Sequence, residues 1–152
     1  MTFTRLFASA ALAPFICLTA LTETPQQTDP VSAIETAIDI QYLEIVTTDV
    51  DATCATLAEV HGVTFSDPVP GFGNARLAVL NNGGQLGVRA PLSADEGAPV
   101  VRPYLGVEDI EAAIIAAQAS GAEFAMLATE IPGYGTFAIY FQGGIQYGLW
   151  QR

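Results

Sequence analysis

Hydrophobic and polar residues alternate along several short stretches of this chain, and two longer stretches carry apolar residues at helical spacing. Residues 40–46 alternate and are rich in β-forming side chains, which predicts a strand. Asp49 follows as a helix cap, and Gly62 ends the helix in the left-handed conformation that glycine allows. The apolar stripe of that helix consists of Val50, Cys54, Leu57, Ala58 and His61. Turn-forming residues then separate three expected short strands, near residues 63–66, 75–80 and 85–89.

The second half of the chain repeats this order of elements. Residues 101–107 predict a strand, Asp109 caps a second helix, and Gly121 closes that helix. The inward stripe of the second helix is Ile110, Ala113, Ile114 and Ala117. Strands are then expected near residues 123–127, 136–141 and 146–150. The predicted order is therefore βαβββ twice.

Residue identities repeat together with the order of elements. The sequence Pro-Gly-Phe-Gly at 70–73 returns about sixty positions later as Pro-Gly-Tyr-Gly at 132–135. Two copies do not make a solenoid, which needs more repeats to bury a core. We therefore predict an α+β fold with two half-domains in a pseudo-twofold arrangement, facing each other across a cleft. The half-domains are expected at about 38–90 and 100–151, joined by a proline-containing linker.

The domain is expected to span residues 37–152, after an N-terminal region of different composition. Residues 1–22 resemble a secretory signal, because Arg5 precedes an apolar run too short and too alanine-rich for a stable membrane span. Residues 23–36 are rich in Thr, Pro, Gln and Asp and form a linker. An alternative start at Val31 stays open, which would make the upstream residues an artefact. The first interpretation predicts an exported, periplasmic protein and the second a cytoplasmic one.

Composition narrows the classes of partner. The chain has 16 acidic residues against five arginines and no lysine, for a net charge of −11. This charge repels phosphate backbones, so we expect no nucleic-acid partner. The two cysteines, Cys17 and Cys54, form neither a disulfide framework nor a zinc spacing, and Cys54 is expected to be buried as a small hydrophobe.

Three segments of the chain resemble one known family. They are Tyr-Leu-Glu-Ile at 42–45, Tyr-Leu-Gly-Val-Glu-Asp-Ile-Glu-Ala-Ala at 104–113, and Gly-Gly-Ile-Gln-Tyr-Gly-Leu-Trp-Gln at 143–151. In order, spacing and duplication they are similar to the vicinal oxygen chelate superfamily, which includes glyoxalases, extradiol dioxygenases and bleomycin-resistance proteins. The resemblance covers about residues 38–151. It implies that the strands of each half curl into an open cup and that the two cups enclose a cavity.

The resemblance also implies four metal-ligand positions, usually His, Glu or Gln. Carried onto this chain, these positions fall on Tyr42, Gly87, Arg102 and Gly148. Glycine offers no donor side chain and a guanidinium repels a cation, so we expect no tightly held catalytic metal and no cofactor. An alignment shifted by one or two residues offers only one carboxylate and two amides, those of Glu44, Gln85 and Gln146.

Strand alternation assigns side chains to two faces of the predicted sheet. Apolar residues expected to pack under the helices are Leu43, Ile45, Leu86, Val88, Pro103, Leu105, Val107 and Leu149. The opposite face, expected to line the cavity, carries Tyr42, Glu44, Gln85, Arg89, Arg102, Tyr104, Gln146 and Trp150. Such a lining suits a small anionic or aromatic molecule, with Arg89 or Arg102 gripping an anion and Gly87 and Gly148 leaving room. An alternative stays open, in which Glu44 pairs with the two arginines and the aromatic rings fill the space as core.

Three functions follow from these observations and the resemblance. The preferred one is a metal-free binding module, comparable with relatives that sequester bleomycin in a groove between two subunits, so a homodimer is also implied. The alternative is a lyase, isomerase or dioxygenase of the same superfamily with atypical ligands, for which Glu44 is the only candidate acid or base. A third possibility is a domain that only packs against a partner and whose ligand site is vestigial.

Overall fold

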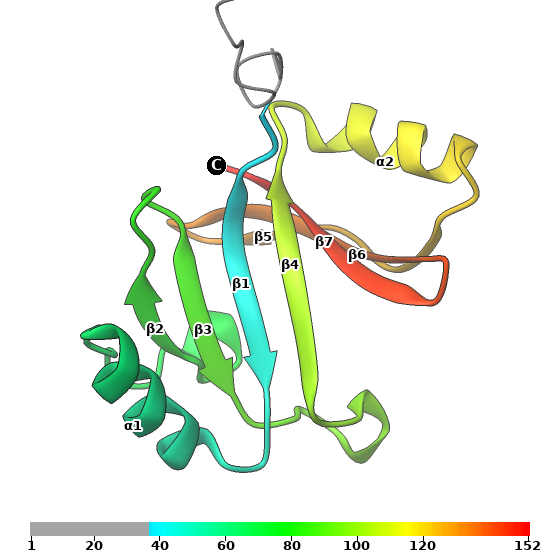
Figure 1. The fold of residues 1–152 in the computed structure, drawn as a ribbon. Helices are drawn as coiled ribbons and strands as arrows, with labels where there is room; N and C mark the ends of the chain where they lie inside the picture. Colours follow the sequence, from blue (N-terminus) through cyan, green and yellow to red (C-terminus); the bar gives the residue numbers. More distant parts are fainter. Residues whose placement is uncertain (1–36) are drawn as a thin grey trace, which may run out of the picture. The chain divides into compact units, whose positions relative to one another are not determined.

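The computed structural model describes residues 37–152, which form one mixed seven-stranded sheet with two α-helices (Figure 1). The predicted signal-like segment and linker, residues 1–36, lie outside the described residues. Within the described part, no helix is long and apolar enough to cross a membrane. In chain order the elements are β1 (Ile40–Val46), α1 (Val50–His61), β2 (Arg76–Val79), β3 (Gln85–Arg89), β4 (Val100–Gly106), α2 (Ile110–Ala119), β5 (Glu123–Ile131), β6 (Gly135–Gln142) and β7 (Ile145–Gln151).

The sheet is built from two similar halves that meet at its centre. Its strand order is β2-β3-β1-β4-β7-β6-β5, so each half contributes one side of the sheet. Within the halves, β1 pairs with β3 and β4 pairs with β7, both in parallel. Between the halves, β1 and β4 run antiparallel, with Glu44 opposite Arg102. The sheet bends so strongly that β5 and β6 cross behind β1 and β4 in Figure 1. The α+β class and the duplicated arrangement are as predicted.

The strand expected at residues 63–66 is absent, and this prediction was wrong. Residues 62–68 lack regular structure, although the backbone N–H of Ser66 donates to the carbonyl of Leu77 at 2.8 Å, and an isolated bridge joins Val69 and Ala75 just beyond. The hydroxyl of Ser66 accepts a hydrogen bond from the backbone N–H of Leu77 at 3.0 Å, a donor that a strand ladder would use. Pro68 and Pro70 follow at once and have no N–H to offer a neighbouring strand. The first half therefore has three strands and the second half four.

The two helices differ in how their first turns are capped. Asp109 accepts a hydrogen bond from the backbone N–H of Ala112 at 3.0 Å, the capping contact predicted for α2. Asp49 precedes α1 but makes no such side-chain bond. At the other end of α1, Gly62 adopts the expected left-handed conformation with φ of 67°. The first helix therefore departs from the prediction in its N-terminal capping contact, and also at His61, which was assigned to the apolar stripe but is exposed.

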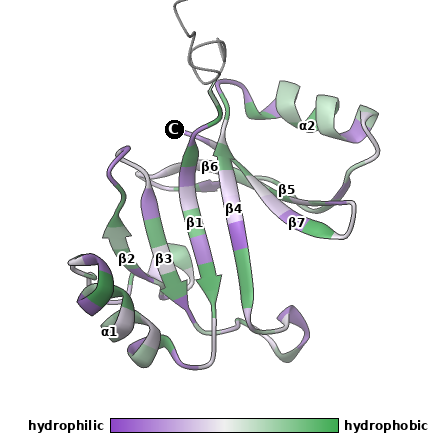
Figure 2. Ribbon diagram, viewed as in Figure 1, coloured by the Kyte–Doolittle hydropathy of each residue, from purple (hydrophilic) through white to green (hydrophobic). Residues whose placement is uncertain are grey.

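Hydrophobic residues gather in two clusters. One lies on the face of the sheet away from the helices and contains residues of both halves, Tyr42, Phe72, Ala75, Tyr104, Ile131 and Trp150. The other lies under α2 and contains Ile110, Ile114, Ala138, Tyr140 and Leu149. In Figure 2, α2 is predominantly hydrophobic, whereas α1 mixes hydrophobic and hydrophilic residues. The second half thus has a core of its own, and the first half shares a core with the second.

The face of the sheet under α1 is incompletely covered. Leu86 and Val88 are buried there, but Leu43 and Ile45 are only half-buried, contrary to the expectation that all would pack under a helix. A hollow of about 400 Å³ separates part of α1 from the sheet, bordered by Leu43, Ile45, Leu57, His61, Val63, Val79, Leu80, Asn81 and Leu86. Cys54 is the only buried residue of α1, as its predicted role as a small hydrophobe requires. The apolar stripe of this helix is too weak to seal the sheet beneath it.

Candidate functional site

A cavity of about 210 Å³ lies on the sheet face that points away from the helices. Its lining comes from both halves and from two connecting segments, residues 71–73 and the linker between the halves. The aromatic part of the lining consists of Tyr42, Phe72, Tyr104, Phe137 and Trp150. The charged part consists of Glu44, Arg89, Glu96 and Arg102. Strands β1, β3, β4 and β7 position most of these side chains, because alternate residues of a strand point to the same face.

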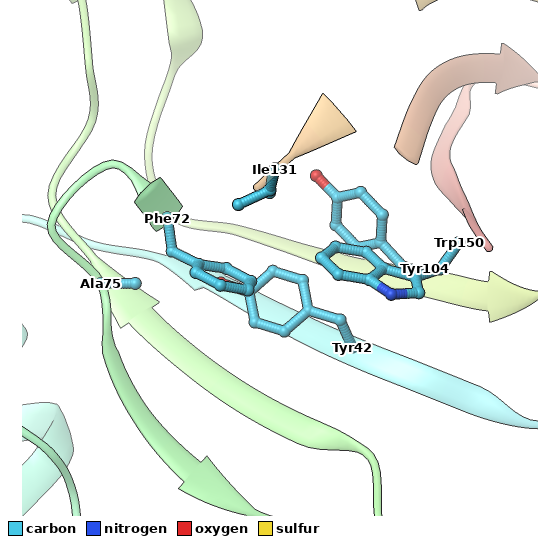
Figure 3. Close-up of a cluster of buried hydrophobic side chains, with 6 residues drawn as sticks. All are labelled: Tyr42, Phe72, Ala75, Tyr104, Ile131 and Trp150. Atoms are coloured by element: carbon cyan, nitrogen blue, oxygen red, sulfur yellow. The ribbon is translucent and has the colours of Figure 1, made fainter. Parts of the chain in front are cut away.

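Closely packed aromatic rings form one wall of the cavity (Figure 3). The rings of Phe72 and Trp150 are nearly parallel, with centroids 5.8 Å apart and planes 13° from each other. Tyr42 extends from β1 toward Phe72, and their ring centroids are 5.2 Å apart. Tyr104 meets Trp150 edge to face at 5.8 Å. This wall gives the cavity a rigid and flat apolar surface, suited to another flat ring.

Two tyrosine rings occupy the space beside the glycines at two of the implied ligand positions. A β-carbon added at Gly87 would overlap the hydroxyl end of Tyr42, and one added at Gly148 would overlap the ring of Tyr104. The expectation that these glycines leave room for a ligand was therefore wrong. The glycines are needed because the rings pack directly on the backbone of β3 and β7.

The four charged side chains form one connected network. Glu44 accepts a hydrogen bond from Arg89 Nε at 2.6 Å through Oε1, and its Oε2 accepts from Arg102 Nη1. The hydroxyl of Tyr104 also lies 3.1 Å from Glu44 Oε2, to which it donates. Arg89 extends the network by a two-pronged ion pair with Glu96, whose Oε2 is 2.8 Å from Nη1. Two guanidinium groups and two carboxylates thus neutralise one another within the wall.

Burial and charge set the protonation states in this network. Burial raises the pKa of Tyr42 and Tyr104 well above the ordinary value, and the Glu44 carboxylate raises both further. The hydrogen bond from Arg89 lowers the pKa of Glu96, although burial opposes this shift. Burial alone would lower the pKa of Arg89, but its bonds to Glu96 and Glu44 outweigh that effect and raise it. Both phenols therefore stay neutral, and the ion pair between Arg89 and Glu96 stays charged, around neutral pH.

The structure brings together most of the residues that the sequence nominated. Six line the cavity: Tyr42, Glu44, Arg89, Arg102, Tyr104 and Trp150. Gln146 lies behind them and accepts a hydrogen bond from Arg102 Nη2 at 2.7 Å. Gln85 does not line the cavity, because it stands at the first residue of β3, opposite Tyr42 and away from the charged network. The pairing of Glu44 with both arginines is the arrangement that was left open as an alternative.

Sequence reasoning missed several lining residues that lie outside the first and last strands of each half. Phe72 belongs to the repeated Pro-Gly-aromatic-Gly turn, so the repeat itself was a signal for it. The second copy of this turn packs beside the first, with the rings of Phe72 and Tyr134 in contact at 4.7 Å. Glu96 comes from the linker, where no pattern marks a residue that will fold back onto Arg89. Ile131 and Phe137 come from β5 and β6.

The donor set does not fit the divalent metal that the resemblance implies. Within residues 37–152, no three His, Cys, Asp or Glu side chains are close enough together to hold an ion. The four implied positions carry a phenol, a guanidinium and two glycines whose space the tyrosines take. The two carboxylates nearby, those of Glu44 and Glu96, are both already paired with arginine side chains. A cation here would have to displace Arg89 and Arg102 from those carboxylates.

Solved structures with the same architecture are numerous. A hypothetical protein from Bacillus halodurans superposes with a TM-score of 0.60 at 14% identity, over 77% of this chain and 96% of that one. Methylmalonyl-CoA epimerase from Mycobacterium tuberculosis superposes with a TM-score of 0.55 at 16% identity, over 73% of this chain and 85% of that chain. A methylmalonyl-CoA epimerase bound to methylmalonyl-CoA gives 0.57 at 15% identity, over 76% and 95% of the two chains. These epimerases are members of the vicinal oxygen chelate superfamily.

The chain has the vicinal oxygen chelate fold. By sequence, neither a protein-family model nor a curated protein matches it. At these identities the likeness shows the fold alone, so the chemistry of the site has to be argued from its own residues. The positions where the resemblance implies metal ligands carry a phenol, a guanidinium and two glycines, beside an aromatic wall and a neutralised ion network.

Proposed function

We propose that this domain binds a small organic molecule with a single aromatic ring in the 210 Å³ cavity, without a divalent metal. The observation that carries the proposal is the wall of stacked rings beside a hollow of this size. An apolar cavity of about 150 Å³ accommodates benzene, so this one has room for a ring with one or two small substituents. The epimerase complexed with methylmalonyl-CoA has a far larger ligand, of which this cavity would hold only a fragment.

The site gives the enzymatic alternative less support. A general base needs a free lone pair within reach of the substrate. Both oxygens of Glu44 are engaged, by Arg89 on one side and by Arg102 and Tyr104 on the other. A lyase, isomerase or dioxygenase with Glu44 as its acid or base would therefore have to break these ion pairs first. The homodimer implied by resemblance stays a prediction, for which light scattering is the measurement.

Trp150 makes the proposal simple to test, because it is the only tryptophan of the chain and stands in the cavity wall. The full chain would be treated with EDTA and titrated with single-ring compounds, following Trp150 fluorescence and, in parallel, calorimetry and thermal unfolding. We expect one molecule bound per chain, a change in Trp150 emission and a raised melting temperature.

Two outcomes would contradict the proposal. If no single-ring compound binds, the cavity is a packing feature. If binding or stabilisation appears only after addition of Mn²⁺, Zn²⁺, Fe²⁺ or Ni²⁺, the enzymatic alternative gains the support that the proposal loses. The variant Trp150→Phe is the matched control for fluorescence, since calorimetry should still detect the ligand when the emission signal is gone.

A further inference from the structure

The charges that face the cavity cancel. Arg89 and Arg102 stand against Glu44 and Glu96, and each guanidinium already donates to a carboxylate. Arg89 and Arg102 are 4% and 2% exposed, so water does little to screen an added charge. An anionic ligand would bring one uncompensated negative charge into this neutral site, in a chain whose net charge is −11. The network therefore disfavours an aromatic carboxylate, although two arginines line the cavity.

Two residues that line the cavity each have a buried hydrogen-bond donor without a partner. Within residues 37–152, three buried side-chain polar atoms make no hydrogen bond, namely Tyr42 Oη, Arg102 Nε and Gln41 Oε1. The first two belong to residues that line the cavity, but neither atom is itself exposed there, and the hydroxyl of Tyr42 rests on the backbone of β3 at Gly87. Tyr42 is 3% exposed, and its burial keeps the phenol protonated by raising its pKa. A buried hydroxyl without a partner is costly, and such a cost is commonly retained where a ligand supplies the missing bond.

The neutral charge balance and the unpartnered phenol point to the same chemistry. Building on the proposed function, we propose that the ligand is an uncharged single-ring aromatic compound with a hydrogen-bond acceptor such as a carbonyl oxygen, and that the Tyr42 ring tilts off Gly87 so that its hydroxyl donates to this acceptor. The ring of the ligand packs on the wall formed by the rings of Phe72 and Trp150. The centroid of the Tyr42 ring lies 5.2 Å from that of Phe72 and 5.6 Å from that of Trp150. Tyr42 then determines specificity for a hydrogen-bond acceptor, and the balanced charges of the network favour an acceptor that is uncharged.

Three probes of nearly equal size separate the possibilities. Acetophenone carries a neutral carbonyl, benzoate carries a carboxylate at the same place, and ethylbenzene carries neither. Their dissociation constants would be measured by calorimetry on the metal-free full chain at neutral pH. We expect acetophenone to bind most tightly, with ethylbenzene about fivefold weaker, which is the usual value of one neutral hydrogen bond. Benzoate should bind weakest.

Removal of the hydroxyl tests the role of Tyr42 with two readouts of opposite direction. Tyr42→Phe should weaken acetophenone binding about fivefold, leave ethylbenzene unchanged, and raise the melting temperature of the ligand-free protein. The rise is expected because the variant deletes a buried polar atom that has no partner. Tyr140→Phe is the matched control, since Tyr140 is also buried but belongs to the cluster under α2. It should change neither the affinities nor their order.

The possible failures are distinguishable. Benzoate binding as tightly as acetophenone would overturn the inference and leave the proposed function standing. Equal affinities of acetophenone and ethylbenzene, or an order that Tyr42→Phe does not alter, would also overturn it. Failure of all three probes to bind would instead count against the proposed function itself.

Discussion

The two halves of this domain have similar strands but unequal helices. Helix α2 packs against β5, β6 and β7 and buries Ile110 and Ile114 in a core of its own. Helix α1 packs mainly against β3, buries only Cys54, and borders a hollow of about 400 Å³. Its exposed ion pair between Asp51 and Arg76, at 3.0 Å, adds little stability.

The difference shows how a duplicated motif divides its tasks. The second half is stabilised by its own helix-covered core, whereas the buried aromatic residues of the first half, Tyr42 and Phe72, face the cavity that both halves share. Stability of the first half is therefore tied to how well that cavity is filled. A ligand would be expected to stabilise the first half more than the second, because only the second half is well packed without it.

The largest effect that the comparison predicts is in the helix cores. Ile114→Ala should destabilise the domain by about 3 kcal/mol, since the residue is 5% exposed and its loss leaves a cavity under α2. Leu57→Ala on α1 should cost about 1 kcal/mol or less, because Leu57 is half-buried and already borders a hollow. Urea unfolding of both variants would measure the difference. Equal costs would show that α1 is packed as firmly as α2.

A smaller difference is expected at the glycines beneath the tyrosines. Gly148→Ala should cost about 2–3 kcal/mol, because the added β-carbon meets the base of the Tyr104 ring, which cannot move without its backbone. Gly87→Ala meets the hydroxyl end of Tyr42, where a small tilt of the ring relieves the overlap, so about 1 kcal/mol is expected. Thermal unfolding would rank the two variants. The reverse ranking would mean that the ring of Tyr42, in the first half, is held more rigidly than the ring of Tyr104.

The smallest difference lies at the helix starts. Asp109→Ala removes a capping bond to Ala112 and should cost about 1 kcal/mol. Asp49→Ala removes a side chain that caps nothing, so its cost should stay within about 0.5 kcal/mol. Both substitutions remove one negative charge close to a helix N-terminus, which makes them matched controls for each other. Denaturant midpoints that shift equally would imply that Asp49 caps α1 in solution.

The fold was predictable largely because periodicity and repetition agree. Alternation along residues 40–46 and helical spacing after Asp49 and Asp109 depend only on local sequence, and each recurs in the other half. The strand at 63–66 failed because the Ser66 side chain and two prolines compete with a ladder, an effect that alternation does not register. A stretch of only four residues gives an alternating pattern too short to outweigh such competition.

The sequence predicted which face of the sheet carries the site, but it predicted the geometry of the site less well. Alternation correctly placed Tyr42, Glu44 and Arg102 on one side of the sheet, because strand period alone decides that. It gave no information on how far a ring reaches, so the space at Gly87 was expected to be open when a tyrosine covers it. Nor could it place Glu96, whose partner is set by how the linker folds rather than by spacing.

The register between β1 and β4 holds the two halves together whether or not the peptide between them is intact. Six residue pairs, from Ile40 with Leu105 to Val46 with Val100, align the halves without help from the peptide segment that joins them. A backbone cut just after Gly97 would leave Glu96 attached to its partner Arg89 and every inter-strand pairing unbroken. The molecule is thus organised like two associated fragments that happen to share one polypeptide, and its termini could be relocated to that cut without disturbing the aromatic wall.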